Sequence, residues 1–398
     1  MSEYKNAPQI RFKDFDDAWE QRKLEEISNR FDNLRVPVSA NEREKGTTPY
    51  YGANGIQDYV KGFTHNGEYV LIAEDGANDL KNYPVKYVNG LFWANNHVHV
   101  VQGKEEICDN KYLKYCFTKT NIESLLVGGG RAKLNANIMM SIDLTVPSFN
   151  EQVELGRMFY ELDNLITLHQ RKYDNLVNVK KSLLEKMFPK NSSNIPEIRF
   201  KGFTDAWEQR KLEDFGKATG GTSIESEFSE NGIYKVISIG SYSENSKYND
   251  QGIRAILSDK TKEKILNKSD LTMILNDKTA NGRIIGRVLY IDKSGTYVYN
   301  QRTERIEIYK EYFEPIFIYQ LLNAPQIRNK IIKQSQGNTQ IFVNWNGIKN
   351  TDYLVPNKTE QVKLGELFTN LDNLITLHQR KQEKLNELKK SMLDKMFI

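Results

Sequence analysis

The 398-residue sequence lacks the features that mark secreted and membrane proteins. Its only two cysteines, Cys108 and Cys116, cannot form a disulfide framework and are typical of a reduced, cytosolic protein. No stretch approaches the ~18 consecutive apolar residues of a membrane helix, and the first residues, MSEYKNAPQIRF, contain no apolar signal region. We therefore expect a cytoplasmic protein with neither a signal peptide nor a membrane span.

An excess of charge of one sign is also missing. The chain has 56 basic and 52 acidic residues, and its formal net charge of +4 is too small to indicate nucleic-acid binding. Any argument for DNA binding must therefore rest on local clusters. With 39% hydrophobic and 27% charged residues, the chain can bury hydrophobic cores, and its length predicts two or three domains.

Signatures of catalytic and cofactor sites are missing as well. Gly103-Lys and Gly216-Lys are followed by Glu and Ala, whereas a nucleotide-binding Walker loop requires Ser or Thr. The ten prolines include no Pro-Pro pair, which excludes the Asn-Pro-Pro-Tyr and Asp-Pro-Pro-Tyr signatures of amino methyltransferases. His97 and His99 could share one face of a strand and bind a metal, but no third ligand accompanies them, so we favour a hydrogen-bonded pair. We expect no catalytic residue, no cofactor and no metal in this chain.

What the chain does contain is an internal duplication. Residues 8–27 (PQIRFKDFDDAWEQRKLEEI) match residues 196–215 (PEIRFKGFTDAWEQRKLEDF) at 15 of 20 positions, with an offset of 188. Residues 146–188 match residues 355–397 with an offset of 209, and both contain the eleven residues LDNLITLHQRK. These offsets exceed the periods of solenoid repeats and indicate a duplicated two-part unit.

Two variable domains, residues 28–145 and 216–354, lie between the matched ends, and the second is 21 residues longer. Runs of β-branched and aromatic residues between Gly, Asn and Asp predict strand-rich domains with a few helices. Similar patterns occupy similar places in both, so we expect one fold with two different surfaces. The predicted strands are residues 69–73, 92–101, 288–291 and 305–309, the predicted helices are residues 109–118 and 315–322, and the matching patterns are residues 94–100 with 299–306 and residues 128–137 with 337–346.

The second repeat predicts a pair of long helices. Apolar residues at alternating spacings of four and three form a heptad seam with polar breaks, and the matching stripe lies in the other copy. We expect the Leu and Ile residues of LDNLITLHQRK to hold the two helices together in an antiparallel pair; a coiled coil between two copies of the chain is the alternative. The two histidines of the seam are interpreted as register-setting residues and not as catalysts. The seam residues assigned to the helices and their partners are Leu162, Ile166, His169, Leu176, Leu183, Leu371, Ile375, His378, Leu385 and Met392.

The duplication also predicts the domain boundaries and the position of the termini. A short polar linker, residues 189–195, joins the first long helix to the second opening repeat. By pseudo-two-fold symmetry the first opening repeat should lie near the end of the second helix, so the termini should be close. The expected parts are residues 1–145, the first variable domain with its repeat segment; residues 146–190, the first spacer helix; residues 191–354, the second variable domain with its repeat segment; and residues 355–398, the second spacer helix.

Polar loops in the variable domains are candidate nucleic-acid contacts. Residues 128–137 combine three glycines with Arg and Lys, which would let the backbone approach a phosphate, although a plain surface loop has the same composition. Residues 337–340 occupy the matching place with amide side chains, which can pair with adenine edges. Residues 278–287 and 50–57 form two further turn-rich loops. The candidate DNA-contacting residues are Asn54, Gln57, Gly129, Arg131, Lys133, Lys278, Asn281, Arg283, Asn338, Thr339 and Gln340.

This arrangement resembles the specificity subunit of bacterial type I restriction–modification enzymes. The resemblance rests on WEQRKL at residues 19–24 and 207–212, and on LDNLITLHQRK in both long helices. It also rests on the Val-Pro pairs at 146 and 355, each followed by Glu-Gln. It covers the whole chain, but the variable domains match the family least, so base contacts cannot be transferred residue by residue.

The resemblance implies an α+β fold with pseudo-two-fold internal duplication. Two strand-rich α/β target-recognition domains would be separated by two long helices that form an antiparallel coiled coil. Each domain would read one half of a bipartite, asymmetric site in double-stranded DNA. The helices would space the domains, and a helix over residues 151–188 would extend roughly 57 Å.

The resemblance also implies partners and assigns the chemistry to them. Two modification (methyltransferase) subunits would dock on the helices and methylate adenine, and two restriction (translocase/nuclease) subunits would complete the complex. S-adenosylmethionine, ATP and Mg²⁺ would be bound by these partners, and this chain would be non-catalytic. The alternative interpretation is a coiled-coil scaffold that organises partner proteins without reading DNA.

Overall fold

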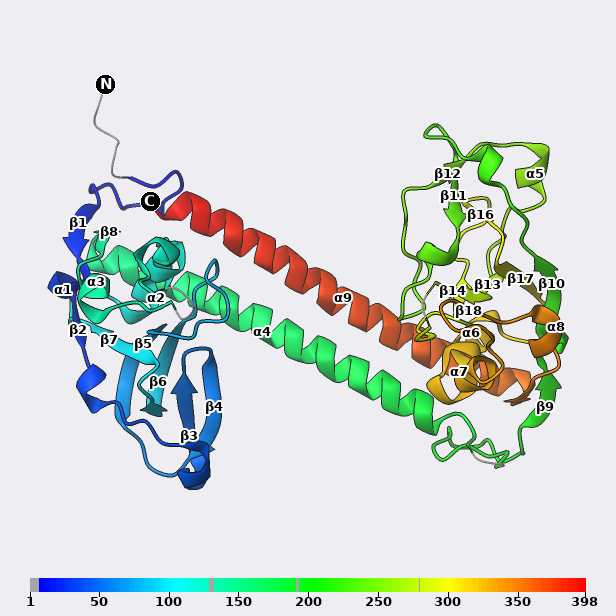
Figure 1. Cartoon of the computed structure of the whole chain (residues 1–398), viewed down its shortest axis with the longest axis horizontal. Helices are drawn as coiled ribbons and strands as arrows, with labels where there is room; N and C mark the ends of the chain where they lie inside the picture. The colour runs from blue at the N-terminus through cyan, green and yellow to red at the C-terminus, as the bar shows by residue number, and fades with distance from the viewer. Residues whose placement is uncertain (1–6, 129–131, 191–192, 279) are drawn as a thin grey trace. The chain divides into compact units, whose positions relative to one another are not determined.

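The computed structural model describes residues 7–128, 132–190, 193–278 and 280–398 (Figure 1). Its contacts divide the chain into two compact units, residues 1–171 with 379–398 and residues 172–378. Each unit contains one variable domain, one opening repeat and a part of both long helices. Within the described ranges, no helix is long and apolar enough to cross a membrane.

The first variable domain is built on a six-stranded sheet with the order β2-β7-β5-β6-β3-β4. Neighbouring strands are antiparallel except β3 and β6, which run parallel with Tyr50 beside Trp93. The central strand β5 contains the buried run 69–73, which confirms the predicted strand. The strands are β2 (Ser28–Arg30), β3 (Lys45–Gly52), β4 (Gly55–Val60), β5 (His65–Ala73), β6 (Val85–Ala94) and β7 (Val98–Gly103).

The single strand predicted over residues 92–101 is wrong. β6 ends at Ala94 and β7 begins at Val98, and the two strands pair with opposite edges of β5. The side-chain oxygen of Asn95 accepts a hydrogen bond from the backbone N–H of His97 at 2.8 Å, which closes a local turn in place of the strand ladder. His97 therefore lies in the turn, and it does not share a strand face with His99.

Helix α2 (Asn110–Lys119) covers one face of this sheet and confirms the helix predicted at residues 109–118. The Asp109 carboxylate caps it by accepting the backbone N–H of Tyr112 at 2.8 Å. Its buried face packs on Val70 and Ile72 of β5, where each fully buried side chain contributes about 1.5–3 kcal/mol. The domain also contains the short helix α3 (Ala136–Met140), and the short helix α1 (Leu24–Ile27) precedes it at the end of the opening repeat.

The second variable domain carries a four-stranded sheet with the order β10-β17-β13-β15 and a three-stranded sheet with the order β12-β11-β16. Its structure confirms the strands predicted at residues 288–291 and 305–309 and the helix predicted at residues 315–322. The strands are β10 (Gly216–Gly220), β11 (Tyr234–Ile237), β12 (Arg254–Ala255), β13 (Leu271–Ile274), β15 (Val288–Tyr290), β16 (Tyr297–Tyr299) and β17 (Thr303–Ile308), and the helices are α5 (Asp259–Lys262), α6 (Pro315–Asn323), α7 (Pro325–Ile332) and α8 (Trp345–Ile348).

The two variable domains share one frame in one register. The strand order β2-β7-β5-β6 of the first corresponds to β10-β17-β13-β15 of the second. Ser28 lies opposite Gly103 and Gly216 lies opposite Ile308, and Ser28 and Gly216 are separated by the 188-residue offset of the opening repeats. The parallel pair β3 and β6 corresponds to the parallel pair β11 and β16. The prediction of one fold with two different surfaces is confirmed.

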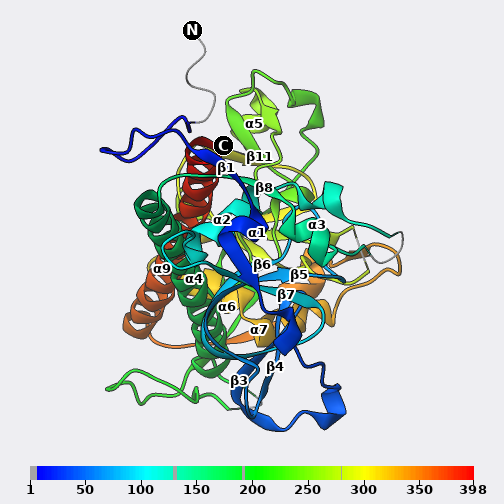
Figure 2. The same ribbon diagram turned by 90° about the vertical axis from the view of Figure 1, so that its left-hand side faces the viewer.

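The opening repeats form the same edge structure in both units. β1 (Glu20–Lys23) pairs antiparallel with β8 (Asp143–Val146), and the two lie beside α1 (Figure 2). β9 (Glu208–Lys211) pairs in the same way with β19 (Asp352–Val355). All four side chains of β1 and all four of β9 are exposed, so backbone hydrogen bonds hold each strand to its partner.

The long helices are α4 (Phe149–Lys186) and α9 (Lys358–Met396), and α4 begins and ends two residues earlier than predicted. Within the first unit, the Asp163 carboxylate of α4 binds the Lys389 ammonium of α9. Within the second unit, Asp372 binds Lys180 at 2.8 Å, which is the same pair displaced by 209 residues. The antiparallel pairing of the two helices within one chain is therefore confirmed.

The segment before β1 closes on the end of α9. Within the first unit, the backbone N–H of Ile10 donates to the carbonyl of Lys395 at 3.0 Å; within the second unit, Ile198 donates to Lys186 at the same distance. Residues 186 and 198 are joined by the linker, whereas residues 10 and 395 meet without a covalent connection. This confirms that the two ends of the chain lie close together. The same aromatic pairs recur at both places, Trp19 with Phe397 and Trp207 with Phe188.

The helix pair buries fewer of the repeated leucines than predicted. Leu165 and Leu168 are 44% and 45% exposed, and Leu374 and Leu377 of the other copy are 43% and 45% exposed. The expectation that these residues hold the helices together is wrong, because one helix can cover only one stripe of its partner. The seam positions fit the prediction better, since Leu371 and Ile375 are buried and the others are half-buried: Leu162, Ile166, His169, Leu176, Leu183, His378, Leu385 and Met392.

Candidate nucleic-acid interface

Residues 74–76, which directly follow β5 in the first variable domain, contact two of the predicted loops. The carbonyl of Glu74 accepts the backbone N–H of Leu134 at 2.7 Å. Asp75 and Lys133 form a β-bridge. The carbonyl of Gly76 accepts the side-chain amide of Asn54 at 2.9 Å. Residues 74–76 therefore bring the predicted residues Asn54 and Lys133 to one surface.

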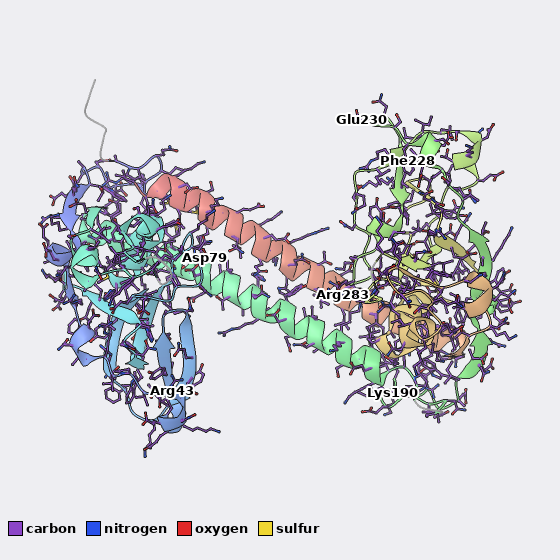
Figure 3. The ribbon with its side chains drawn as sticks, viewed as in Figure 1. Arg43, Asp79, Lys190, Phe228, Glu230 and Arg283 are labelled. Atoms are coloured by element: carbon purple, nitrogen blue, oxygen red, sulfur yellow. The ribbon has the colours of Figure 1, made fainter. Side chains whose placement is uncertain are left out.

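Asn54 lies at the tip of the hairpin between β3 and β4. Its side-chain oxygen accepts the backbone N–H of Asn78 at 2.9 Å, and its amide donates to Gly76, so both ends of the side chain hold the loop after β5. Asp79 follows in that loop (Figure 3). Gln57, from β4 of the same hairpin, is exposed. Its side-chain oxygen accepts the amide of Asn95 at 3.5 Å, so Gln57 is an exposed residue that is held against the domain, while Asn54 holds the loop after β5.

The glycine-rich loop of the first domain is described at both of its ends. Gly129 and Arg131 lie outside the described residues. Val127 and Lys133 pair across the base of the loop, and Gly128 has φ 97°, which favours glycine. In the second domain Gln336 and Phe342 pair in the same way, and Gly337 has φ 101°. The two pairs are related by the 209-residue offset, so each domain has the base of a hairpin at the same place in its fold.

The predicted residues of the second variable domain also come together. β14 (Asn276–Asp277) pairs with β18 (Ile341–Phe342), which places the loop after β14 beside the turn before β18. Arg283 lies in the first of these loops (Figure 3). It donates to the exposed carboxylate of Glu244 at 3.0 Å. All six predicted side chains are exposed: Lys278, Asn281, Arg283, Asn338, Thr339 and Gln340.

Two anchors under this second surface were not predicted. The Asp277 carboxylate accepts the backbone N–H of Ile284 at 2.9 Å. The Arg328 guanidinium of α7 donates to the carbonyls of Ile285, at 3.0 Å, and Gly282. Burial and the nearby Arg287 lower the pKa of Arg328 to about 10. A lone Arg in a short helix gives no sequence signal for this function.

A buried ion network under the first surface was also missed. We call it the Glu74 network: Asp32, Arg35, Glu74, His99 and Lys133. Asp32 binds Nδ1 of His99 at 2.7 Å, and Arg35 binds Glu74 at 2.5 Å. The Lys133 ammonium lies 2.7 Å from the other oxygen of Glu74. Burial opposes ionisation of both carboxylates, but hydrogen bonds from His99 to Asp32, and from Lys133 and Arg35 to Glu74, hold each pKa below its ordinary value.

The ligand atoms of Asp32, Glu74 and His99 lie within 4.8 Å of one another, a grouping that could hold a metal ion. The donors do not suit a metal, however. Nε2 of His99 lies 2.8 Å from the carbonyl of Leu134 and Nδ1 faces Asp32, so both ring nitrogens face acceptors. The two carboxylates are bound to cations. The cluster is therefore a network in which two carboxylates are bound by Arg35, Lys133 and the His99 imidazole.

The sequence matches the family described as type I restriction modification DNA specificity domain over residues 16–178 and 204–387. The two matches cover most of the chain, one for each copy of the duplicated unit. The chain belongs to this family. The duplicated frame and the paired long helices are thus the family's architecture, and the expected α+β fold is confirmed.

Relatives in the specificity family divide into local and full-length matches. A Haemophilus influenzae protein named as a type I restriction enzyme specificity subunit is 46% identical over 149 residues, which span 37% of this chain and 38% of the relative. The MjaVIII specificity subunit of Methanocaldococcus jannaschii is 23% identical over 402 residues, covering 94% of this chain and 91% of the relative. The 46% identity with the Haemophilus influenzae protein therefore extends over only part of this chain.

A solved structure shows the same fold. The crystal structure of a type I restriction–modification system S subunit from M. genitalium aligns with a TM-score of 0.66 and 13% identity. The alignment covers 98% of this chain and 99% of that chain. At this identity the match establishes the fold alone.

Proposed function

We propose that this chain is the DNA-reading subunit of a type I restriction–modification complex. Each variable domain reads one half of a bipartite, asymmetric site in double-stranded DNA. The observation that carries this proposal is one frame built twice, with the same hairpin presented on it, and different side chains on that hairpin: Lys133 in one copy, Phe342 in the other. A duplicated reader with two different reading surfaces suits a site with two different halves.

The chemistry belongs to partner subunits in this proposal. The chain contributes no catalytic residue, and S-adenosylmethionine, ATP and Mg²⁺ are bound by two modification and two restriction subunits. The modification subunits dock on the long helices. This docking is supported by the four leucines at positions 165, 168, 374 and 377, because the same residues are exposed to the same extent in both copies. Two identical apolar surfaces suit two copies of one partner.

Substituting these leucines tests the docking. Leu165→Ser with Leu168→Ser should reduce the copurifying methyltransferase subunits from two to one, and so should the equivalent changes at Leu374 and Leu377. The stability of the chain itself should change by no more than about 0.5 kcal/mol, because the residues are exposed. Ile233→Ser, at a 69% exposed position of the second domain, is the control. Retention of two partners by the leucine variants would refute this docking site.

Mapping of the methylated positions in DNA modified by the complex tests the reading function. The proposal expects a two-part motif with different halves and an unspecified spacer. One continuous palindrome would refute it. The alternative function, a scaffold that organises partners without reading DNA, predicts a complex that assembles but shows no sequence-selective, salt-resistant DNA binding.

A further inference from the structure

The Glu74 network has no counterpart in kind at the equivalent positions of the second domain. The carbonyl of Glu74 accepts the N–H of Leu134, and the carbonyl of Leu275 accepts the N–H of Val343. Since residues 134 and 343 are related by the repeat offset, Glu74 corresponds to Leu275. An apolar side chain therefore stands where the first domain has its central carboxylate.

Three further members of the network are replaced by residues of a different kind. Gly220 lies opposite Glu304 in the β10–β17 register, as Asp32 lies against His99 in the first domain. Gly220 therefore corresponds to Asp32, and Glu304 corresponds to His99. The remaining correspondence, at the base of the hairpin, is Lys133 with Phe342. The frame therefore folds in the same register without these charges, and folding alone does not account for the network.

Glu74 connects the interior of the first domain to its candidate DNA surface. The residue is 8% exposed, and one of its oxygens is bound by Arg35 at 2.5 Å and lies 3.7 Å from His99. The other oxygen binds Lys133, whose side chain is 45% exposed. Arg35 is itself fixed, because it also donates to the carbonyl of Val98 at 2.7 Å. Arg35 therefore holds one oxygen of Glu74, and the other oxygen binds the exposed ammonium of Lys133.

We propose that Glu74 is a positioning residue for recognition of the first DNA half-site. It fixes the Lys133 ammonium at the base of the hairpin, so that the N–H groups not used by Glu74 point to an acceptor oxygen of the DNA. The second half-site is read without such an ion pair. This inference rests on the proposed function, and it goes further by assigning to one domain a specificity device that the other does not use.

The test uses the full chain in complex with its methyltransferase subunits and two DNA libraries. One library is randomised in the first half-site and the other in the second. In Glu74→Gln, which keeps the shape of the side chain and removes its charge, discrimination at the first half-site should fall about tenfold. The profile of the second half-site should stay as in the unmutated complex. Lys133→Arg, which preserves the ion pair, should restore or retain discrimination.

Two control variants separate this effect from general changes of charge. Glu44→Gln removes a carboxylate of the same domain that pairs with Lys61 on the surface, where both side chains are about three-quarters exposed. Glu304→Gln changes the position of the second domain that corresponds to His99. Both variants should leave the first half-site profile unchanged.

Salt dependence separates positioning from direct contact. Lys133→Met should relax the first half-site, because a contact to a base edge is lost, and it should lower the slope of log affinity against log salt by about one, because a cation is removed from the DNA interface. Glu74→Gln should relax the same half-site without lowering this slope. If Glu74→Gln does not fold, Glu74→Asp, which keeps the charge and shortens the reach to Lys133 by one methylene, is tested with the same libraries and should also reduce discrimination at the first half-site.

The inference is overturned if Glu74→Gln lowers the melting temperature but leaves both profiles intact, because the network would then be structural only. It is also overturned if both half-sites relax together. Failure of the proposed function is distinguishable, since it is read from the unmutated complex, which would then modify no two-part site.

Discussion

The two variable domains support the same hairpin on the same frame by different means. In the first, Glu74, whose carboxylate is bound by Arg35, binds Lys133 at the base of the hairpin. In the second, Phe342 occupies that position, and the neighbouring loop is held through its backbone by Asp277 and Arg328. The sheet register therefore determines the frame, and the polar groups beneath the surface can differ between the two domains.

The two copies of the repeats should contribute equally to the free energy of unfolding, although the two variable domains differ. The buried ion pair of each copy should give the largest effect. Arg11 donates two hydrogen bonds of 2.7 Å to Glu151, and Arg199 donates two of 2.8 and 2.7 Å to Glu360. Each glutamate is only 1% exposed. Arg11→Met and Arg199→Met should each cost about 3–5 kcal/mol, because each leaves a buried carboxylate without its partner. Urea denaturation of the full chain measures this.

Exposed pairs of the same repeats provide the matched control. Arg22 with Glu20 and Arg210 with Glu208 lie on the surface, and replacing either arginine by Met should cost less than about 1 kcal/mol. A difference of more than about 1 kcal/mol between Arg11→Met and Arg199→Met would break the equivalence of the two repeats.

The helix pair should show an intermediate difference between the copies. Asp163 binds Lys389 and in addition the Lys114 ammonium at 2.6 Å and the Tyr115 hydroxyl at 2.7 Å. Burial lowers the pKa of Lys114 to about 8, although Asp163 opposes this. Asp163→Asn should therefore cost about 2–3 kcal/mol, since it leaves a buried ammonium without a counter-charge.

The same change in the other copy should cost less. Asp372 binds Lys180 and the Gln320 amide, so Asp372→Asn leaves only one cation unpaired and should cost about 1–2 kcal/mol. Thermal unfolding of both variants side by side measures the difference. An equal cost would show that the domain contacts of Asp163 contribute nothing.

The smallest expected effect concerns pH and has opposite signs in the two domains. Burial raises the pKa of Glu304 from 4.5 to about 7, so its favourable contribution is complete below pH 4.5 and is lost as the pH rises through 7. Glu304→Gln removes this loss and should stabilise the chain by on the order of 1 kcal/mol at pH 8, with no gain at pH 4. Denaturant midpoints at the two pH values measure it.

Glu74 should behave in the opposite way. Despite burial, Lys133 and Arg35 hold its pKa below the ordinary value, so its contribution is present above pH 4.5 and is lost as the pH falls through the native pKa. Glu74→Gln should therefore be more destabilising at pH 7 than at pH 3. If the stability effects of Glu74→Gln and Glu304→Gln changed with pH in the same direction, the two domains would not differ in the way expected.

Much of the fold could be predicted because the sequence contains each repeat twice. The repeat offsets alone indicated which helices pair and where the ends of the chain lie, and the pairs Asp163–Lys389 and Asp372–Lys180 follow from them. The exposed stripe at Leu165 was not predicted, since spacing does not tell which of two apolar stripes a partner covers.

The candidate site was less predictable. The hairpins were located from their glycines and the shared Asn-x-Asn pattern, and Asn135 and Asn344 indeed precede α3 and α8. The Glu74 network was not predicted, because its five members come from four separate segments and only the fold brings them together. The assignment of individual DNA contacts stays a prediction.

Exchange of the first variable domain tests directly whether each variable domain reads its own half-site. Residues 28–145 would be replaced by the corresponding domain of another member of the specificity family, with both repeats and the second domain unchanged. Mapping of the methylated DNA should show a two-part motif in which only one half has changed. A change in both halves would contradict the account, because specificity would then not reside in separate domains on one duplicated frame.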